Sequence, residues 1–303
     1  MRKYNRYYNT MKNLINVFQD TLEISKRSPN TSITTKHTFD EVIKPTTHTG
    51  IQEAVAKANA VAEKIQFEGK YYRKDIGYEF KSPEYNGNIS VVNLDTVSAI
   101  TEYSKLGKVC AINMASYKRP GGGVERGARA QEECLFRCSN LFDVISKDFY
   151  PLNENECLYT ERALFFKDKD YEWMETVECD IITSAALRLA GVVTDKGIVG
   201  YEPENEKVNY DWMTREKIRL MCSVPHTKGS NILILGAWGC GVFNNDPTKM
   251  ANFFKDVLIG EGYSSLYDKV VFAVINDHNS VGNNFDIFNK ILNEQIQQKE
   301  KTN

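Results

Sequence analysis

From residue 88 onward, short apolar runs that suit β-strands alternate with segments that suit helices. The runs include "VCAI" at 109–112, "ILIL" at 232–235 and "VVFAVI" at 270–275. Because each run is apolar without interruption, both faces of the corresponding strand are expected to be buried. The helical segments between the strands would cover those faces. The alternation therefore predicts an α/β fold with helices on both sides of a mixed, mostly parallel sheet.

Turn and capping signals divide this region into individual elements. We expect strands at about 88–94, 108–113, 179–187, 230–238 and 268–276, and helices at about 95–107, 131–144, 210–222, 247–258 and 283–297. Asp95 or Thr96 is expected to cap the first of these helices, and Asp246 followed by Pro247 is a favourable start for the fourth.

The first eighty residues have a different pattern, with apolar residues at helical spacing on both sides of a polar break. One set is Leu14, Val17, Phe18 and Leu22, and the other is Ile51, Val55, Ala58, Ala62 and Ile65. Between them lies the turn-rich segment "KRSPNTSITTKHT" at 26–38. We therefore predict an N-terminal helical accessory region at 1–84, packed against the α/β domain at 85–303.

Charge and cysteine content limit the possible function classes. Lys and Arg total 38 against 40 Asp and Glu, giving a net charge of -2, so no surface for duplex nucleic acid is expected. The seven cysteines lie mostly in apolar segments, which indicates reduced thiols and a cytoplasmic protein. Cys134 and Cys138 lack the further ligands of a zinc site, so we expect no metal. No apolar stretch reaches the roughly 18 residues of a membrane span.

Two of the apolar runs lead directly into glycine clusters. The first cluster is Gly121, Gly122 and Gly123, and the second extends from Gly236 to Gly241. In open α/β sheets, ligands bind beyond the carboxyl ends of the strands, where glycines let backbone N–H groups approach phosphate. Two such loops indicate a diphosphate site, and the helix expected after Pro247 also favours an anion.

Neither cluster matches a common nucleotide-binding signature. The pattern G-x-G-x-x-G fails at Arg126 in the first loop and at Asn244 in the second, and G-x-x-x-x-G-K fails at Ala128. A Rossmann dehydrogenase and a P-loop kinase are therefore disfavoured.

The triplet Gln131-Glu132-Glu133 follows the first loop where a helix is expected to begin. Acidic residues in a first helical turn often only complement the helix dipole. Beside a ligand held by the glycines, two adjacent carboxylates would instead serve hydroxyl recognition and proton transfer. Because like charges penalise double ionisation, one carboxyl would keep its proton near neutral pH, as a general acid requires.

The segment "GGGVERGARAQEE" at 121–133 resembles the signature of the bacterial-type poly(ADP-ribose) glycohydrolases, a branch of the macrodomain superfamily. "NMAS" at 113–116, "LGAWGCGVFNNDP" at 235–247 and "FAVIND" at 272–277 also resemble family segments in family order. The resemblance covers about residues 85–295. It implies a three-layer α/β/α macrodomain, extended here by the N-terminal helices, that binds ADP-ribose.

The resemblance also implies a function and site residues. The expected activity is hydrolysis of ribose-ribose O-glycosidic bonds from the ends of poly(ADP-ribose), releasing ADP-ribose without a cofactor. Glu133 would be the general acid and base, while Glu132 would bind ribose hydroxyls. The implied binding residues are Asn113, Gly121, Gly122, Gly123 and Gln131 around the ribose, and Gly239, Cys240, Gly241, Val242 and Phe243 around the diphosphate and the adjoining ribose.

Two alternative functions stay open. A non-catalytic macrodomain would only bind ADP-ribose, and a hydrolase of single ADP-ribose marks would use the same pocket on other ADP-ribosylated macromolecules.

One segment departs from the family pattern. The family's Ala-Ala-Pro-Asn is here Ala185-Ala186-Leu187-Arg188, which leaves contacts made there undefined. Phe285 is the candidate for stacking on adenine, with burial in the core as the competing interpretation.

Overall fold

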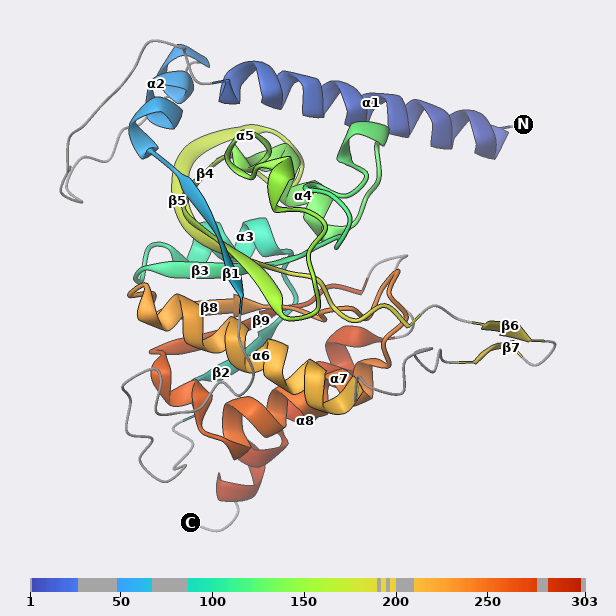
Figure 1. The fold of residues 1–303 in the computed structure, drawn as a ribbon, viewed down its shortest axis with the longest axis vertical. Helices are drawn as coiled ribbons and strands as arrows, with labels where there is room; N and C mark the ends of the chain where they lie inside the picture. Colours follow the sequence, from blue (N-terminus) through green and yellow to red (C-terminus); the bar gives the residue numbers. More distant parts are fainter. Residues whose placement is uncertain are drawn as a thin grey trace.

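The computed structural model describes residues 2–26, 48–66, 87–189, 192–194, 197–199, 210–276 and 283–300 (Figure 1). Most of the turn-rich segment expected at 26–38 lies outside these residues. In the described part of the chain, no helix is both long enough and apolar enough to cross a membrane.

A seven-stranded mixed sheet forms the centre of the fold, in the order β1-β4-β5-β3-β8-β9-β2. Its strands are β1 (Val61–Gln66), β2 (Ile89–Val92), β3 (Val109–Met114), β4 (Glu156–Lys167), β5 (Trp173–Ser184), β8 (Ile232–Leu235) and β9 (Lys269–Ala273). Neighbours from β5 to β2 pair in parallel, whereas β4 is antiparallel to both β1 and β5. A separate antiparallel pair joins β6 (Val192–Thr194) and β7 (Gly197–Val199). The expected mixed, mostly parallel sheet is confirmed.

Helices cover both faces of this sheet (Figure 1). One face carries α3 (Thr96–Tyr103), α4 (Gln131–Cys138) and α5 (Leu141–Val144), and the other carries α6 (Tyr210–Thr227), α7 (Pro247–Lys255) and α8 (Asn284–Glu300). The core between the sheet and these six helices is accordingly divided into two clusters, and a third cluster lies between the two N-terminal helices and β4. Ile100 and Phe136 belong to the cluster on the first face, while Met221, Phe254 and Phe288 belong to the second. The three-layer α/β/α arrangement is confirmed.

Two N-terminal helices, α1 (Arg2–Ser25) and α2 (His48–Ala58), complete the first face. Figure 1 shows α1 running across the side of α4 and α5 that faces away from the sheet. The N-terminal helical extension expected from the sequence is therefore present.

The structure corrects the expected elements in three places. Residues 61–66, which include Ala62 and Ile65, form strand β1 instead of continuing a helix, because they pair with β4. The helix expected at 131–144 is interrupted at Ser139, whose extended backbone bridges to Phe165. Strand β4 was not expected at all. The division at residue 84 stays a prediction, although β1 joins the main sheet from before that boundary.

Two buried cations attach α1 to helix α4 and strand β4. The Lys167 side chain is only 1% exposed, and its Nζ lies 2.6 Å from Asp20 Oδ2 and 3.0 Å from Thr21 Oγ1. Arg137 of α4 is fully buried, and its guanidinium donates to the carbonyls of Leu14 and Ala128. Since a buried charge is costly without partners, these contacts make α1 part of the packed structure.

We expect Asp20→Ala to destabilise the protein, because it removes the only carboxylate recorded beside buried Lys167 in the described residues. The expected loss in the free energy of unfolding is about 2 kcal/mol, less than for a fully buried pair because Asp20 is half exposed. Combining Asp20→Ala with Lys167→Met should restore part of the loss. Thermal unfolding of the three proteins tests this, and an unchanged melting temperature in Asp20→Ala would contradict it.

Candidate active site

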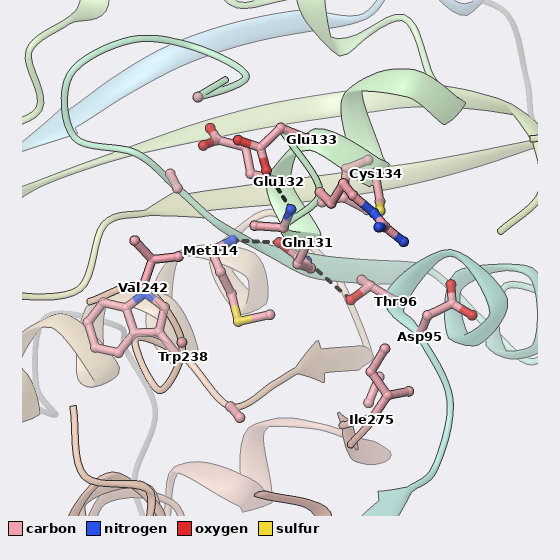
Figure 2. A pocket seen from close by; sticks show the side chains of 18 of the residues that line it. Asp95, Thr96, Met114, Gln131, Glu132, Glu133, Cys134, Trp238, Val242 and Ile275 are labelled. Atoms are coloured by element: carbon pink, nitrogen blue, oxygen red, sulfur yellow. Dashed lines mark hydrogen bonds between the residues drawn. The ribbon is translucent and has the colours of Figure 1, made fainter. Parts of the chain in front are cut away.

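The two glycine loops meet at one edge of the sheet. They follow β3 and β8, which are neighbouring parallel strands, so both loops leave at the carboxyl ends. A cavity of about 790 Å³ lies between them. Of the residues expected at the site, it is lined by Gly122, Gly123, Gln131, Glu132, Glu133, Gly239, Gly241, Val242 and Phe243 (Figure 2).

Three expected site residues do not line this cavity. Gly121 is buried within the first loop, against Phe136 and Val124, and Asn113 is fully buried near the end of β3. Cys240 is fully buried in the core, where burial raises the pKa of its thiol. These residues shape the site from behind.

The first loop leaves no space for side chains at its glycines. Gly121 and Gly122 have φ values of 68° and 52°, in the left-handed region. A Cβ on Gly122 would lie 2.6 Å from Glu133 Oε1 and 2.8 Å from Glu132 Oε2. The absence of a side chain at Gly122 therefore lets both carboxylates occupy the cavity wall.

The Glu133 carboxylate is held by backbone N–H groups of the same loop. Gly123 donates to Oε1 and Ala130 donates to Oε2, each at 2.8 Å. Ala130 is also the N-cap of α4, so Glu133 bonds to the cap from the third helical position. Its side chain is thus fixed at both oxygens while the residue lines the cavity.

Glu132 is buried and partly desolvated. Its Oε2 accepts the Ser116 N–H at 2.7 Å, and its Oε1 lies 3.4 Å from Asn113 Nδ2. Burial raises the pKa of Glu132 to about 8, with a smaller contribution from the Glu133 carboxylate, although the bond from Ser116 acts in the opposite direction. Glu132 therefore retains a proton at neutral pH.

Gln131 connects the site to two other elements. Its side-chain oxygen accepts the Met114 N–H at 2.9 Å, and its amide nitrogen donates to Thr96 Oγ1 (Figure 2). The same amide nitrogen also donates to Ile112 O. All three bonds are internal to the protein. They hold the end of β3 against the starts of α3 and α4.

Asn245 organises the second loop. Its Nδ2 donates to the carbonyls of Gly239 and Leu187, each at 3.0 Å. The N–H of Leu189 donates to Phe243 O. The segment that departs from the family pattern is thereby connected to this loop. Asp246 caps α7, with Pro247 at its start, as expected.

Several N–H groups of the second loop are candidate donors to a ligand. Within the described residues, no acceptor is recorded for the N–H of Gly239, Gly241, Val242 or Phe243. The Cys240 N–H, in contrast, donates to Ala237 O at 3.1 Å. Unpaired amides that converge on a cavity suit an anion.

Other residues also line the cavity that were not expected there from the sequence. Asp95, Ser116, Trp238 and Ile275 line it, as do the cations Lys118, Arg119, Arg126 and Arg129. The cations flank the three glycines in the sequence, but the near-neutral total charge gave no signal for them. Phe285 packs against the second-face core cluster and is not among the lining residues.

Known proteins give an independent comparison. Residues 47–168 match the family model for the catalytic domain of microbial-type PARG. A poly(ADP-ribose) glycohydrolase structure from Thermomonospora curvata is similar with a TM-score of 0.69 and 24% identity, over 92% of this chain and 99% of that one. A Deinococcus radiodurans glycohydrolase in complex with ADP-ribose has a TM-score of 0.59 and 28% identity, over 69% of this chain and 84% of that one. The resemblance to the bacterial-type poly(ADP-ribose) glycohydrolases is confirmed.

A second Thermomonospora glycohydrolase structure, bound to the inhibitor ADP-HPD, gives a TM-score of 0.66 at 23% identity, over 91% of this chain and 98% of that one. Its likeness shows a shared fold. The comparison with curated proteins finds no match.

The raised pKa of Glu132 predicts a pH dependence of stability. An unfolded glutamate has a pKa near 4.5, so between about pH 5 and about pH 8 the folded state binds the additional proton. The contribution of Glu132 to the free energy of unfolding is therefore largest at low pH and falls by about 1 kcal/mol for each pH unit in this window. Glu132→Gln cannot ionise and should have a flatter profile.

Melting temperatures of the wild type and Glu132→Gln at about pH 5.5 and about pH 7.5 test this expectation. The variant should gain stability relative to the wild type as the pH rises through this window. Parallel pH profiles for the two proteins would show that Glu132 is ionised throughout.

Proposed function

We propose that this chain is a poly(ADP-ribose) glycohydrolase that releases ADP-ribose from polymer ends. The observation that supports this best is the joint position of Glu132 and Glu133 in the wall of a cavity that also includes free N–H groups of a second loop. One side of the cavity offers proton transfer and the other offers an anion site. A terminal ADP-ribose unit needs both for its glycosidic bond and its diphosphate.

In this proposal the diphosphate binds to the second loop. Gly239, Gly241, Val242 and Phe243 would donate their N–H groups to its oxygens. Cys240 would contribute through its position in the turn, since its own N–H is already bonded. Gly122 and Gly123 would lie beside the ribose next to the scissile bond, and Asn113 and Gln131 would support the wall behind it.

In the proposed chemical step, Glu133 is the general acid. As the bond between the ribose C1 and the leaving oxygen breaks, the electron pair goes to the oxygen and Glu133 supplies its proton. The resulting carboxylate then takes a proton from a water molecule as that water attacks the oxocarbenium-like carbon. This restores the acid, and no cofactor or metal is required.

Glu132 takes a separate role. As a neutral carboxyl with two acceptor oxygens and one O–H, it would both donate to and accept from ribose hydroxyls. The raised pKa of Glu132 allows an alternative mechanism, in which Glu132 and not Glu133 is the proton donor. Matched substitutions separate the two assignments.

The alternatives differ in substrate or in chemistry. A binding-only macrodomain has no use for a pair of buried carboxylates, whose desolvation is costly. A hydrolase of single ADP-ribose marks would use the same cavity and is distinguished by assays on both substrates. The cytoplasmic location expected from the seven cysteines also stays a proposal, supported by their presence as free thiols.

The second loop is tested by Gly241→Val. A branched side chain beside the free N–H groups should exclude the diphosphate, lowering ADP-ribose affinity at least about tenfold, which corresponds to about 1.4 kcal/mol. Gly260→Val is a matched control, since a Cβ there meets no atom within 4 Å. Calorimetric titration with ADP-ribose measures both. Equal affinities for Gly241→Val and the control would refute this role of the loop.

The two glutamates are tested by Glu133→Gln and Glu132→Gln. Glu133→Gln cannot donate a proton as an acid, so turnover of the polymer should fall at least about 100-fold while ADP-ribose binding survives. Glu132→Gln resembles the neutral carboxyl and should lower affinity and turnover less than about tenfold, the worth of one hydrogen bond. Glu102→Gln, on the exposed side of α3, serves as the control.

Chromatography of products from poly(ADP-ribose) and from mono-ADP-ribosylated protein gives the turnover of each protein. The reverse ranking, with Glu132→Gln the more damaged variant, would transfer the acid to Glu132. Near-normal turnover in both variants would mean that the carboxylates only support the structure. A wild type that cleaves neither substrate would leave the binding-only alternative.

A further inference from the structure

Cations are distributed unevenly around the cavity. Lys118, Arg119, Arg126 and Arg129, called here the basic rim, all belong to the loop between β3 and α4 and all line the cavity. Among the described lining residues, the second loop contributes no lysine or arginine. The cavity therefore has a cationic side at the first loop and a side of neutral amides at the second.

No acidic side chain in the part of the chain that the structure describes neutralises the basic rim. All four side chains are exposed, and none forms an ion pair with another described residue. Lys169 also lines the cavity but pairs with Asp170 and is not counted in the rim. In the loop at 115–130, Glu125 is the one acidic residue.

The basic rim lies next to the proposed catalytic carboxylate. Arg129 adjoins Ala130, whose N–H donates to Glu133, and the Arg119 carbonyl accepts the N–H of Gly122. Neighbouring Cα atoms are about 3.8 Å apart, so these long side chains extend from the backbone that holds the acid. The cations are thus on the glutamate side of the cavity.

We infer that the basic rim binds the diphosphate groups of the polymer strand that stays behind after cleavage. This inference rests on the proposed function. The diphosphate of the departing ADP-ribose is already matched by the amides of the second loop, so the rim suits a different anion. The strand beyond the scissile bond leaves the cavity on the glutamate side and carries a diphosphate in every unit, which fits a row of unpaired cations.

This placement has a consequence for substrate preference. A single ADP-ribose mark on a protein has no second diphosphate to engage the rim, whereas any polymer has one. The basic rim therefore favours poly(ADP-ribose) over single ADP-ribose marks. It does so by raising the affinity of the protein for the polymer in the ground state. Because exposed charge pairs are weak and screened, the preference should decrease with salt.

The test compares two double variants with the same change in charge. Arg126→Gln with Arg129→Gln removes half of the rim, and Lys105→Gln with Lys269→Gln removes two exposed lysines that do not line the cavity. Both are made in the Glu133→Gln protein so that the polymer stays intact during titration. Fluorescence anisotropy measures the affinity for labelled poly(ADP-ribose) at several salt concentrations, and calorimetry measures the affinity for ADP-ribose.

The rim variant should bind polymer about fivefold to tenfold more weakly than the control, as expected for two exposed charge contacts. The slope of log affinity against log salt should become shallower by about 1 to 2. ADP-ribose affinity should stay within about twofold of the control.

Equal polymer affinities in the two variants would overturn the inference. A parallel loss of ADP-ribose affinity would also overturn it, because the rim would then hold the departing unit. Loss of binding to a mono-ADP-ribosylated acidic peptide, with polymer affinity unchanged, would assign the rim to the protein carrier. Turnover by the wild type is measured separately, so failure of the proposed hydrolysis is distinguished from failure of the rim.

Discussion

The two hydrogen bonds that Glu133 accepts from the first loop are the constraint on which the rest of the site depends. Its two oxygens accept the N–H groups of Gly123 and Ala130, which joins the two ends of the segment between them. The carboxylate can reach both only because Gly122 has no Cβ to collide with it. The three glycines and the glutamate are therefore one structural unit, in which the loop positions the acid and the acid closes the loop.

The two glycine loops use their backbone donors in different ways. The first loop directs N–H groups at Glu132 and Glu133, through Ser116, Gly123 and Ala130. In the described part of the chain, several N–H groups of the second loop have no acceptor, while the Asn245 side chain donates to the carbonyls of the loop. One loop thus directs its N–H groups at carboxyl groups of the protein, and the other has N–H groups available for an anionic ligand. The sequence does not reveal this difference, because both loops are rich in glycine.

The sequence predicted strands β3 and β8, whose residues are buried on both faces, and it predicted the meeting of the two loops. β3 and β8 were recognised because "VCAI" and "ILIL" are apolar without interruption, and parallel neighbours end at the same edge. β4 was missed because Glu161 and Arg162 interrupt its apolar pattern at the point where its register with β5 shifts. The spacing of Ala62 and Ile65 suits a helix as well as an edge strand, and pairing with β4 decides between them.

Spacing in the sequence also identified the two glutamates as a pair, but not which one keeps a proton. Glu132 keeps a proton because burial raises its pKa against the opposing effect of the hydrogen bonds donated by Ser116 and Asn113, and that burial depends on residues distant along the chain. The basic rim was missed for a related reason. Its four cations are ordinary surface residues in the sequence, and only the cavity gives them a shared position.

The N-terminal helix is connected to the loop that holds Glu133 through a buried charge. Arg137 follows Glu133 by one helical turn in α4, so the two residues share a helix face. Its guanidinium bonds to Ala128 in the glutamate loop and to Leu14 in α1, while a Cβ on Gly127 would lie 2.8 Å from Met11 O. The glutamate loop is therefore enclosed between α4 and α1. Because a buried guanidinium without acceptors is strongly unfavourable, removing α1 would release the loop that orients Glu133.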